Sequence, residues 1–170
     1  MTGDVVNVHE REIPVPAARA GALIGTLASS RDALWPVKTW PRMSLDRPLG
    51  IGAAGGHGPI RYVVEDYIPG RLVRFRFTRP KGFQGYHEYE ALGKGRQAAV
   101  LRHTVRMSLH GAARLSWPLL YRPLHDALLE DSLAAAEAAL GIPPRRRPWS
   151  AWVRLLRRAL SAAGPRTGAE

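Results

Sequence analysis

The amino-acid sequence predicts an α+β fold in which a curved antiparallel β-sheet wraps around a long C-terminal α-helix, with short helices after the first strand. Two observations predict this fold. Strand-like runs at 60–67, 71–78, 83–91 and 98–110 follow one another across short turns, which is typical of an antiparallel meander. An apolar-periodic segment at 122–140 then follows and predicts the helix.

A strand and short helices are expected before the meander. Residues 5–15 are β-branched and partly alternating, which predicts a strand that ends at its prolines. Residues 17–34 predict one or two helices. The Trp-, Pro- and Gly-rich segment 35–59 closes with Gly55-Gly56-His57-Gly58-Pro59. This run lacks the Lys-Ser/Thr of a phosphate-binding loop and no helix is expected after it, so it predicts a bend before the strand at Ile60.

The turns set the expected register of the meander. Pro69 and Gly70 suit the centre of a type II turn. This turn places Glu65 opposite Arg74 on the outer face. The inward pairs expected from this turn, and from matching the apolar faces of the next hairpin, are Val64 with Phe75, Tyr62 with Phe77, Tyr89 with Leu101, His87 with His103 and Phe83 with Met107.

The order of elements and several motifs resemble a known superfamily. The motifs are Pro-Val-Pro-Ala after the first strand, Trp35-Pro36, Trp40-Pro41, the run from Val64 to Phe75 and the run from Pro123 to Asp131. Over roughly residues 5–140 the chain resembles the START-like (SRPBCC, polyketide cyclase/dehydrase and lipid-transport) superfamily, which has the helix-grip fold. The resemblance implies a cavity between sheet and helix that binds lipids, hormones or polyketides, and that supports chemistry in a minority of members.

Three polar residues are expected to point into this cavity. His87 and His103 form the cross-strand pair given above, and Asp131 lies near the centre of the apolar stripe of helix 122–140. A carboxylate on a core-facing stripe is costly unless paired, so we expect an inward His or Arg from the sheet as its partner. Such a cluster could orient a ligand, act in acid–base chemistry or form a satisfied structural hydrogen bond. Two His and one carboxylate could also hold a metal, but nothing in the spacing requires one, and we expect no metal and no cofactor.

We therefore expect the protein to bind a small hydrophobic ligand, lipid- or polyketide-like, between the sheet and the C-terminal helix. The expected ligand-binding residues are Trp35, Trp40, His57, Tyr62, Phe75, Phe77, His87, Tyr89, His103, Met107, Leu124, Leu128 and Asp131. Catalysis stays open: a polyketide cyclase- or dehydratase-like enzyme would use His87 or His103 as base and Asp131 as the orienting group. The remaining histidines, His9, His110 and His125, are predicted to lie at the surface or at a sheet edge, without a role.

The positive charge of the chain gathers at its C-terminal end. The 170 residues include 25 Lys and Arg, 14 Asp and Glu and no Cys, for a formal net charge of +11. The lack of Cys excludes a disulfide scaffold, a thiolate zinc site and a Cys nucleophile. Residues 141–170 hold seven arginines and one glutamate, a net charge of +6. Because no basic stripe with interleaved aromatic residues is expected on the sheet, the pattern disfavours nucleic acid as a partner.

The sequence predicts a ligand-binding domain at 1–141, followed at 142–170 by a basic Pro/Arg linker and a short amphipathic helix at 149–163. This helix could lie on an anionic membrane, pack on the domain or contact a second subunit. The residues expected to make that contact are Arg145, Arg146, Arg147, Trp149, Trp152, Arg154, Arg157 and Arg158. No export signal and no run of 18 apolar residues is found, so we expect a cytoplasmic location, with peripheral membrane contact as the alternative.

Overall fold

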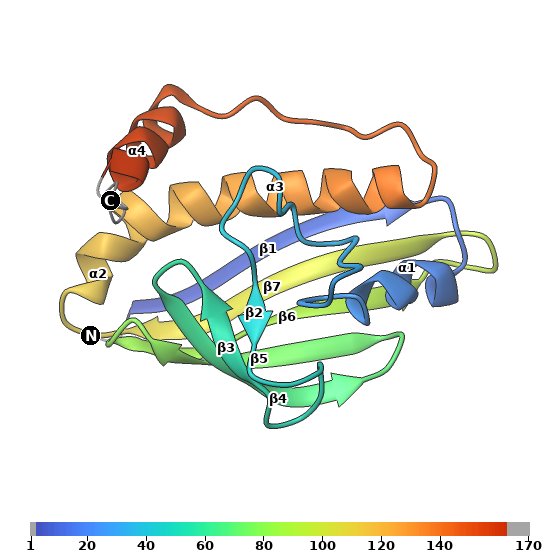
Figure 1. The fold of residues 1–170 in the computed structure, drawn as a ribbon, viewed down its shortest axis with the longest axis horizontal. Coiled ribbons are helices and arrows are strands. Elements are labelled where there is room, and N and C mark those ends of the chain that lie inside the picture. Colours follow the sequence, from blue (N-terminus) through green and yellow to red (C-terminus); the bar gives the residue numbers. More distant parts are fainter. Residues whose placement is uncertain (1–2, 163–170) are drawn as a thin grey trace, which may run out of the picture.

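The computed structural model describes residues 3–162 and has the predicted α+β architecture (Figure 1). Its antiparallel sheet has seven strands in the order β1-β7-β6-β5-β4-β3-β2. The strands are β1 (Gly3–Ile13), β2 (Ser44–Leu45), β3 (Ala54–His57), β4 (Ile60–Ile68), β5 (Leu72–Arg79), β6 (Phe83–Gly93) and β7 (Ala99–Leu109). The helices are α1 (Ala17–Ile24), α2 (Ala113–Ser116), the π-helix η1 (Trp117–Tyr121), α3 (Arg122–Ala139) and α4 (Ala151–Ala162). Helix α3 lies along one face of the sheet, as expected of a helix-grip fold.

The C-terminal helix begins earlier than predicted, because α2, η1 and α3 follow one another from Ala113 without a break. Pro123 has no N–H to donate to the carbonyl of Leu119, four residues before it. The indole Nε1 of Trp152, on α4, donates to that oxygen at 2.9 Å.

The end of the helix agrees with the prediction, since Gly141 has a φ of 76° and the N–H of Ile142 donates a hydrogen bond to the carbonyl of Glu137.

Two predictions for the N-terminal half hold only in part. The helical segment expected over 17–34 ends at Ile24, because Asp32 accepts hydrogen bonds from the backbone N–H groups of Ala28, Leu34 and Trp35 and organises a loop instead. The glycine-rich run forms strand β3 rather than only a bend. A Cβ atom at Gly55 would lie 1.9 Å from the carbonyl oxygen of Ser44, so the pairing of β3 with β2 needs glycine there.

The predicted register holds in part. Between β4 and β5, Val64 faces Phe75 and Tyr62 faces Phe77, as expected. A bulge at Glu65 places Asp66 opposite Arg74, so the expected pair of Glu65 with Arg74 is wrong.

The register between β6 and β7 differs from the prediction by two residues. The observed pairs are Phe83 with Leu109, His87 with Val105, Tyr89 with His103 and Ala91 with Leu101. A shift of two residues keeps every side chain on its predicted face of the sheet. The inward residues therefore still point inward, although their direct partners change.

The linker after α3 packs on the domain and returns the chain to the far end of α3, where α4 lies (Figure 1). Glu137 of α3 is fully buried and accepts hydrogen bonds from Nη1 of Arg11 (3.0 Å), from Nε of Arg145 (2.6 Å) and from the backbone N–H of Arg145 (2.7 Å). Val153 of α4 belongs to the main hydrophobic core. Of the alternatives for the tail, the structure shows packing on the domain. Within residues 3–162 no helix combines the length and the hydropathy needed to cross a bilayer.

Candidate functional site

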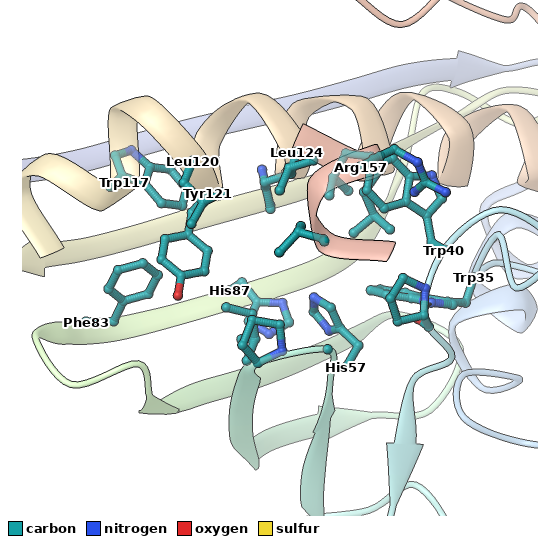
Figure 2. Close-up of a pocket in the computed structure, with 18 of the residues that line it drawn as sticks. Trp35, Trp40, His57, Phe83, His87, Trp117, Leu120, Tyr121, Leu124 and Arg157 are labelled. Carbon is teal, nitrogen blue, oxygen red and sulfur yellow. Dashed lines mark hydrogen bonds between the residues drawn. The ribbon is translucent and has the colours of Figure 1, made fainter. Parts of the chain in front are cut away.

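A cavity of about 360 Å³ lies between the sheet and the segment formed by η1 and α3. Figure 2 shows Trp35 and Trp40 at one end, Phe83 and Trp117 at the other, and His57 and His87 between them. The lining residues are Trp35, Trp40, Pro41, His57, Gly58, Pro59, Ile60, Phe77, Phe83, His87, His103, Trp117, Leu120, Tyr121, Leu124, His125, Leu128, Leu129, Arg157, Leu160 and Ser161. Most of them are aromatic or aliphatic, and the last three come from α4, which covers part of the opening.

Eight of the thirteen expected ligand-binding residues line this cavity: Trp35, Trp40, His57, Phe77, His87, His103, Leu124 and Leu128. The other five, Tyr62, Phe75, Tyr89, Met107 and Asp131, do not. Tyr62, Phe75 and Tyr89 are buried in the main core behind the lining residues. Met107 belongs to a second core cluster with Phe83 and Trp117.

Tyr89 marks the place where the space between sheet and helix is filled by the protein itself. Its hydroxyl lies 2.8 Å from Oγ of Ser132 on α3. The Ser132 hydroxyl donates its own hydrogen to the carbonyl of Leu34 at 2.9 Å, so the Tyr89 hydroxyl must be the donor to Ser132. This buried chain of hydrogen bonds joins β6, α3 and the loop before β2, and the open cavity therefore lies at the other end of α3.

Asp131 has different partners from those expected. Its Oδ2 accepts hydrogen bonds from the indole Nε1 of Trp40 at 2.8 Å and of Trp149 at 3.0 Å. No histidine or arginine of the sheet bonds to it among the described residues. The guanidinium of Arg157 lies 4.3 Å from the ring centroid of Trp40 and 4.4 Å from that of Trp149, within cation–π range. Asp131 thus joins the loop after α1 to the end of the linker before α4, at the rim of the cavity.

His87 and His103 contact each other, as expected. Nδ1 of His87 lies 3.2 Å from Nε2 of His103. The outer nitrogens, Nε2 of His87 and Nδ1 of His103, are buried and have no hydrogen-bond partner within the described chain. Because one ring must donate to the other, the pair leaves one donor and one acceptor free. Burial lowers the pKa of both imidazoles well below 6.5, which keeps them neutral.

His57 adds a third neutral imidazole. Its Nδ1 lies 3.1 Å from the hydroxyl of Tyr62, and its ring is tilted against Trp35 at a centroid distance of 4.7 Å. Burial lowers the pKa of His57 to about 3. The histidines of the cavity therefore offer neutral hydrogen-bonding groups, and the formal charge lies at the rim on Arg157.

The prediction that His125 lies at the surface or a sheet edge is wrong. His125 lines the cavity from α3, and its ring centroid lies 5.1 Å from that of His103. Neither of its ring nitrogens has a hydrogen-bond partner within residues 3–162. Burial lowers its pKa. The signal was present in the sequence, because Tyr121, His125, Leu128 and Ser132 follow one another at helical spacing.

Other lining residues were missed for two reasons. The predicted helix began at residue 122, so Trp117 and Tyr121 were not placed on it. Arg157, Leu160 and Ser161 were missed as lining residues because no sequence pattern says where α4 docks.

Comparisons with known proteins identify the fold. No protein-family model matches the chain, and no curated protein matches it. Solved structures do: norcoclaurine synthase from Thalictrum flavum aligns with a TM-score of 0.62 at 15% identity, over 83% of this chain and 97% of that one. CalU16 from Micromonospora echinospora aligns with a TM-score of 0.56 at 10% identity, over 95% and 94%. Ara h 8.0201 aligns with a TM-score of 0.59 at 11% identity, over 82% and 99%. The chain shares the helix-grip fold of these proteins.

Proposed function

We propose that this chain is a START-like protein that binds a small, mostly apolar ligand carrying hydroxyl or carbonyl groups. The observation that carries the proposal is an open cavity of about 360 Å³ with aromatic walls and buried, unpartnered imidazole nitrogens. Ligand pockets in proteins have this size and this composition, with a few polar groups that set the orientation of the ligand. A ligand hydroxyl or carbonyl near His87, His103 or His125 would supply the hydrogen bonds that these rings lack.

The likeness of fold supports a ligand of this chemistry. Norcoclaurine synthase from Thalictrum flavum is described in complex with dopamine and hydroxybenzaldehyde, two aromatic molecules that carry hydroxyl groups. The cavity of this chain would suit molecules of this kind, because its walls are mostly aromatic and carry a few hydrogen-bonding groups. Binding here would come mostly from apolar burial, at roughly 25 cal/mol per Å² before ordering costs.

Catalysis of the cyclase or dehydratase type has less support than binding. The scheme of a histidine base oriented by Asp131 needs contact between them, and Asp131 instead accepts hydrogen bonds from two indoles. The His87–His103 pair remains a candidate base, since its rings are neutral.

Two measurements test the binding proposal. Native mass spectrometry of freshly purified protein should show a co-purified small molecule. After removal of that molecule, the protein should bind the fluorescent probe 1-anilinonaphthalene-8-sulfonate, and the fluorescence of the probe measures the binding. Leu124→Trp fills the cavity and should abolish probe binding, whereas Leu119→Trp, on η1 with an exposed side chain, should not. Equal probe binding by the wild type and by Leu124→Trp, with both variants folded by circular dichroism, would refute the proposal.

A second candidate function, peripheral contact with an anionic membrane, is favoured by one exposed surface. Large apolar side chains are exposed on α2, η1 and α4: Leu115 is 70% exposed, Leu119 60%, Leu155 55% and Trp152 47%, and the indole of Trp152 bonds to the carbonyl of Leu119. Arg154 and Arg158, on α4, are exposed as well. Aromatic and aliphatic groups beside arginines suit the interface of a bilayer with anionic headgroups.

Vesicle flotation tests this candidate. The full chain should float with phosphatidylcholine vesicles that contain phosphatidylglycerol, and less with phosphatidylcholine alone. Leu119→Ser with Leu155→Ser should reduce flotation, whereas Ile51→Ser, at a side chain 69% exposed elsewhere on the protein, should not. Equal flotation of all three proteins would exclude this surface.

A further inference from the structure

A second group of polar side chains lies between β1 and α3, next to the cavity. His9 comes from β1, and His125 and Asp126 come from α3. One ligand atom of each, all within 4.8 Å of one another, could contact a single ion. Nε2 of His9 lies 3.0 Å from Oδ1 of Asp126, and Nδ1 of His125 lies 3.6 Å from the same oxygen.

The neighbours of this group hold its donors in place. Nδ1 of His9 lies 3.1 Å from Oε1 of Glu130, which leaves Nε2 directed at Asp126. A carboxylate on the far nitrogen is the usual way in which proteins orient a metal-binding histidine. Arg122 lies 3.7 Å from Oδ2 of Asp126, on the other carboxylate oxygen, so Oδ1 remains the oxygen shared by the two histidines.

Two half-buried side chains at this place have buried atoms without hydrogen-bond partners. Neither ring nitrogen of His125 has a hydrogen-bond partner within the described residues. Oδ1 of Asn7 is also buried without a partner, while its Nδ2 donates to Oδ1 of Asp126 at 3.0 Å. The amide oxygen and nitrogen of asparagine exchange places on a rotation of 180°, which would turn Oδ1 of Asn7 toward Asp126. That arrangement repels the carboxylate unless a cation lies between the two oxygens.

We propose that His9, His125 and Asp126, with Asn7 as a fourth ligand, form a binding site for a divalent transition-metal ion of the zinc type. Two imidazoles and a carboxylate are typical ligands of such ions. With bonds of about 2.0–2.1 Å, tetrahedral ligand atoms lie about 3.3–3.5 Å apart. The separations of 3.0 and 3.6 Å at Asp126 are close to these values, and the two histidine nitrogens, which lie within 4.8 Å of each other, can approach further by side-chain rotation. The partly exposed Asp126 gives the ion a path from solvent.

The site shares His125 with the proposed ligand cavity, whereas Asn7, His9 and Asp126 do not line the cavity. An ion there would join β1 to α3, two elements that are far apart in the sequence. It would also hold the His125 ring in one orientation at the cavity wall.

The test uses the full chain after treatment with a chelator, titrated with Co²⁺ and followed by its visible absorption bands, and with Zn²⁺ followed by calorimetry. We expect one equivalent of ion to bind and Zn²⁺ to raise the melting temperature. His125→Gln should weaken binding more than tenfold. This variant is decisive because it removes no hydrogen bond from the folded protein, whereas His9→Gln removes two.

His110→Gln is the matched control, since His110 follows β7 and is outside the cluster. It should bind Co²⁺ as the wild type does, while Asp126→Asn should lose binding as His125→Gln does. If the wild type binds no ion, or if binding is unchanged in both His125→Gln and Asp126→Asn, the proposal is wrong and the cluster is an ion pair of His9 with two carboxylates. Probe binding to the cavity is measured on the ion-free protein, so its result does not depend on whether the ion binds and the two proposals fail separately.

Discussion

Asp131 accepts a hydrogen bond from Trp40, a residue 91 positions earlier in the chain, with 2.8 Å between Oδ2 and the indole Nε1. The same oxygen accepts a second indole N–H, from Trp149, which directly follows Pro148 at the end of the Arg-rich linker. One carboxylate therefore determines how two segments meet at the rim of the cavity.

Asp131→Ala should lower the free energy of unfolding by about 2–3 kcal/mol, because it leaves two partly buried indole N–H groups without an acceptor. Asp131→Asn keeps one acceptor oxygen and should lose less. Guanidinium unfolding of the three proteins, followed by tryptophan fluorescence, measures the difference. A change below 0.5 kcal/mol for Asp131→Ala, a threshold of about the size of neutral surface substitutions, would contradict the assigned contacts.

Ser132→Ala should destabilise the protein more than Tyr89→Phe does. The serine variant leaves both the Tyr89 hydroxyl and the carbonyl of Leu34 unpaired in the core, which costs about 2–3 kcal/mol. The tyrosine variant removes one donor and leaves the Ser132 hydroxyl bonded to Leu34, for a loss of about 1 kcal/mol. Denaturant unfolding of both variants and of the double variant gives the order. The reverse order would mean that the hydroxyls point the other way.

Glu137→Gln should be among the most damaging single changes, because Arg11 is left buried with less of its counter-charge. Breaking a buried ion pair on one side costs about 3–5 kcal/mol. Glu65→Gln is the matched control, since Glu65 makes one exposed ion pair with Arg76 and should change stability by less than about 1 kcal/mol. Equal thermal unfolding of the two variants would show that Glu137 does not hold the linker in place.

Stability should fall as the pH decreases below 6.5. Burial lowers the pKa of His87 and His103 in the folded protein, so the unfolded chain binds protons at these rings first. The contribution is complete above pH 6.5, and below it each ring that stays neutral in the folded protein lowers the free energy of unfolding by at most about 1.4 kcal/mol per pH unit. His87→Phe with His103→Leu should make the dependence shallower in denaturant unfolding at pH 7.5, 6.5 and 5, and the rest of it comes from the buried His57 and His125. Parallel curves for this variant and the wild type would show that the rings do not titrate in this way.

Much of the fold could be predicted because hydrophobic alternation and turn residues are local signals. The long meander strands and the end of the last helix at Gly141 follow from them directly. The bulge at Glu65 could not be predicted, since a single extra residue changes no apolar pattern. The short strands β2 and β3 also gave no signal, because glycines that allow close strand approach look the same as glycines in a turn.

The site could be predicted to the level of faces but not of partners. Alternation placed His87 and His103 on the inward face of the sheet. The register error of two residues between β6 and β7 did not change that placement, because a shift by two keeps each side chain on its face. Asp131 was placed on the inward stripe, yet its partners come from a loop and from the tail, whose positions depend on tertiary packing. For the same reason Arg157 could not be predicted as a lining residue, because its contact with Trp40 forms only when α4 packs on the domain.

Pro123 influences the position of α4 because it has no backbone N–H. Its missing amide leaves the carbonyl of Leu119 open to the indole of Trp152, so the register of α4 against η1 is encoded by a gap in the backbone hydrogen bonding of another element. Replacing this proline by alanine would set two donors in competition for one oxygen. The helix would then be more regular, but the hydrogen bond that holds α4 against η1 would be weakened.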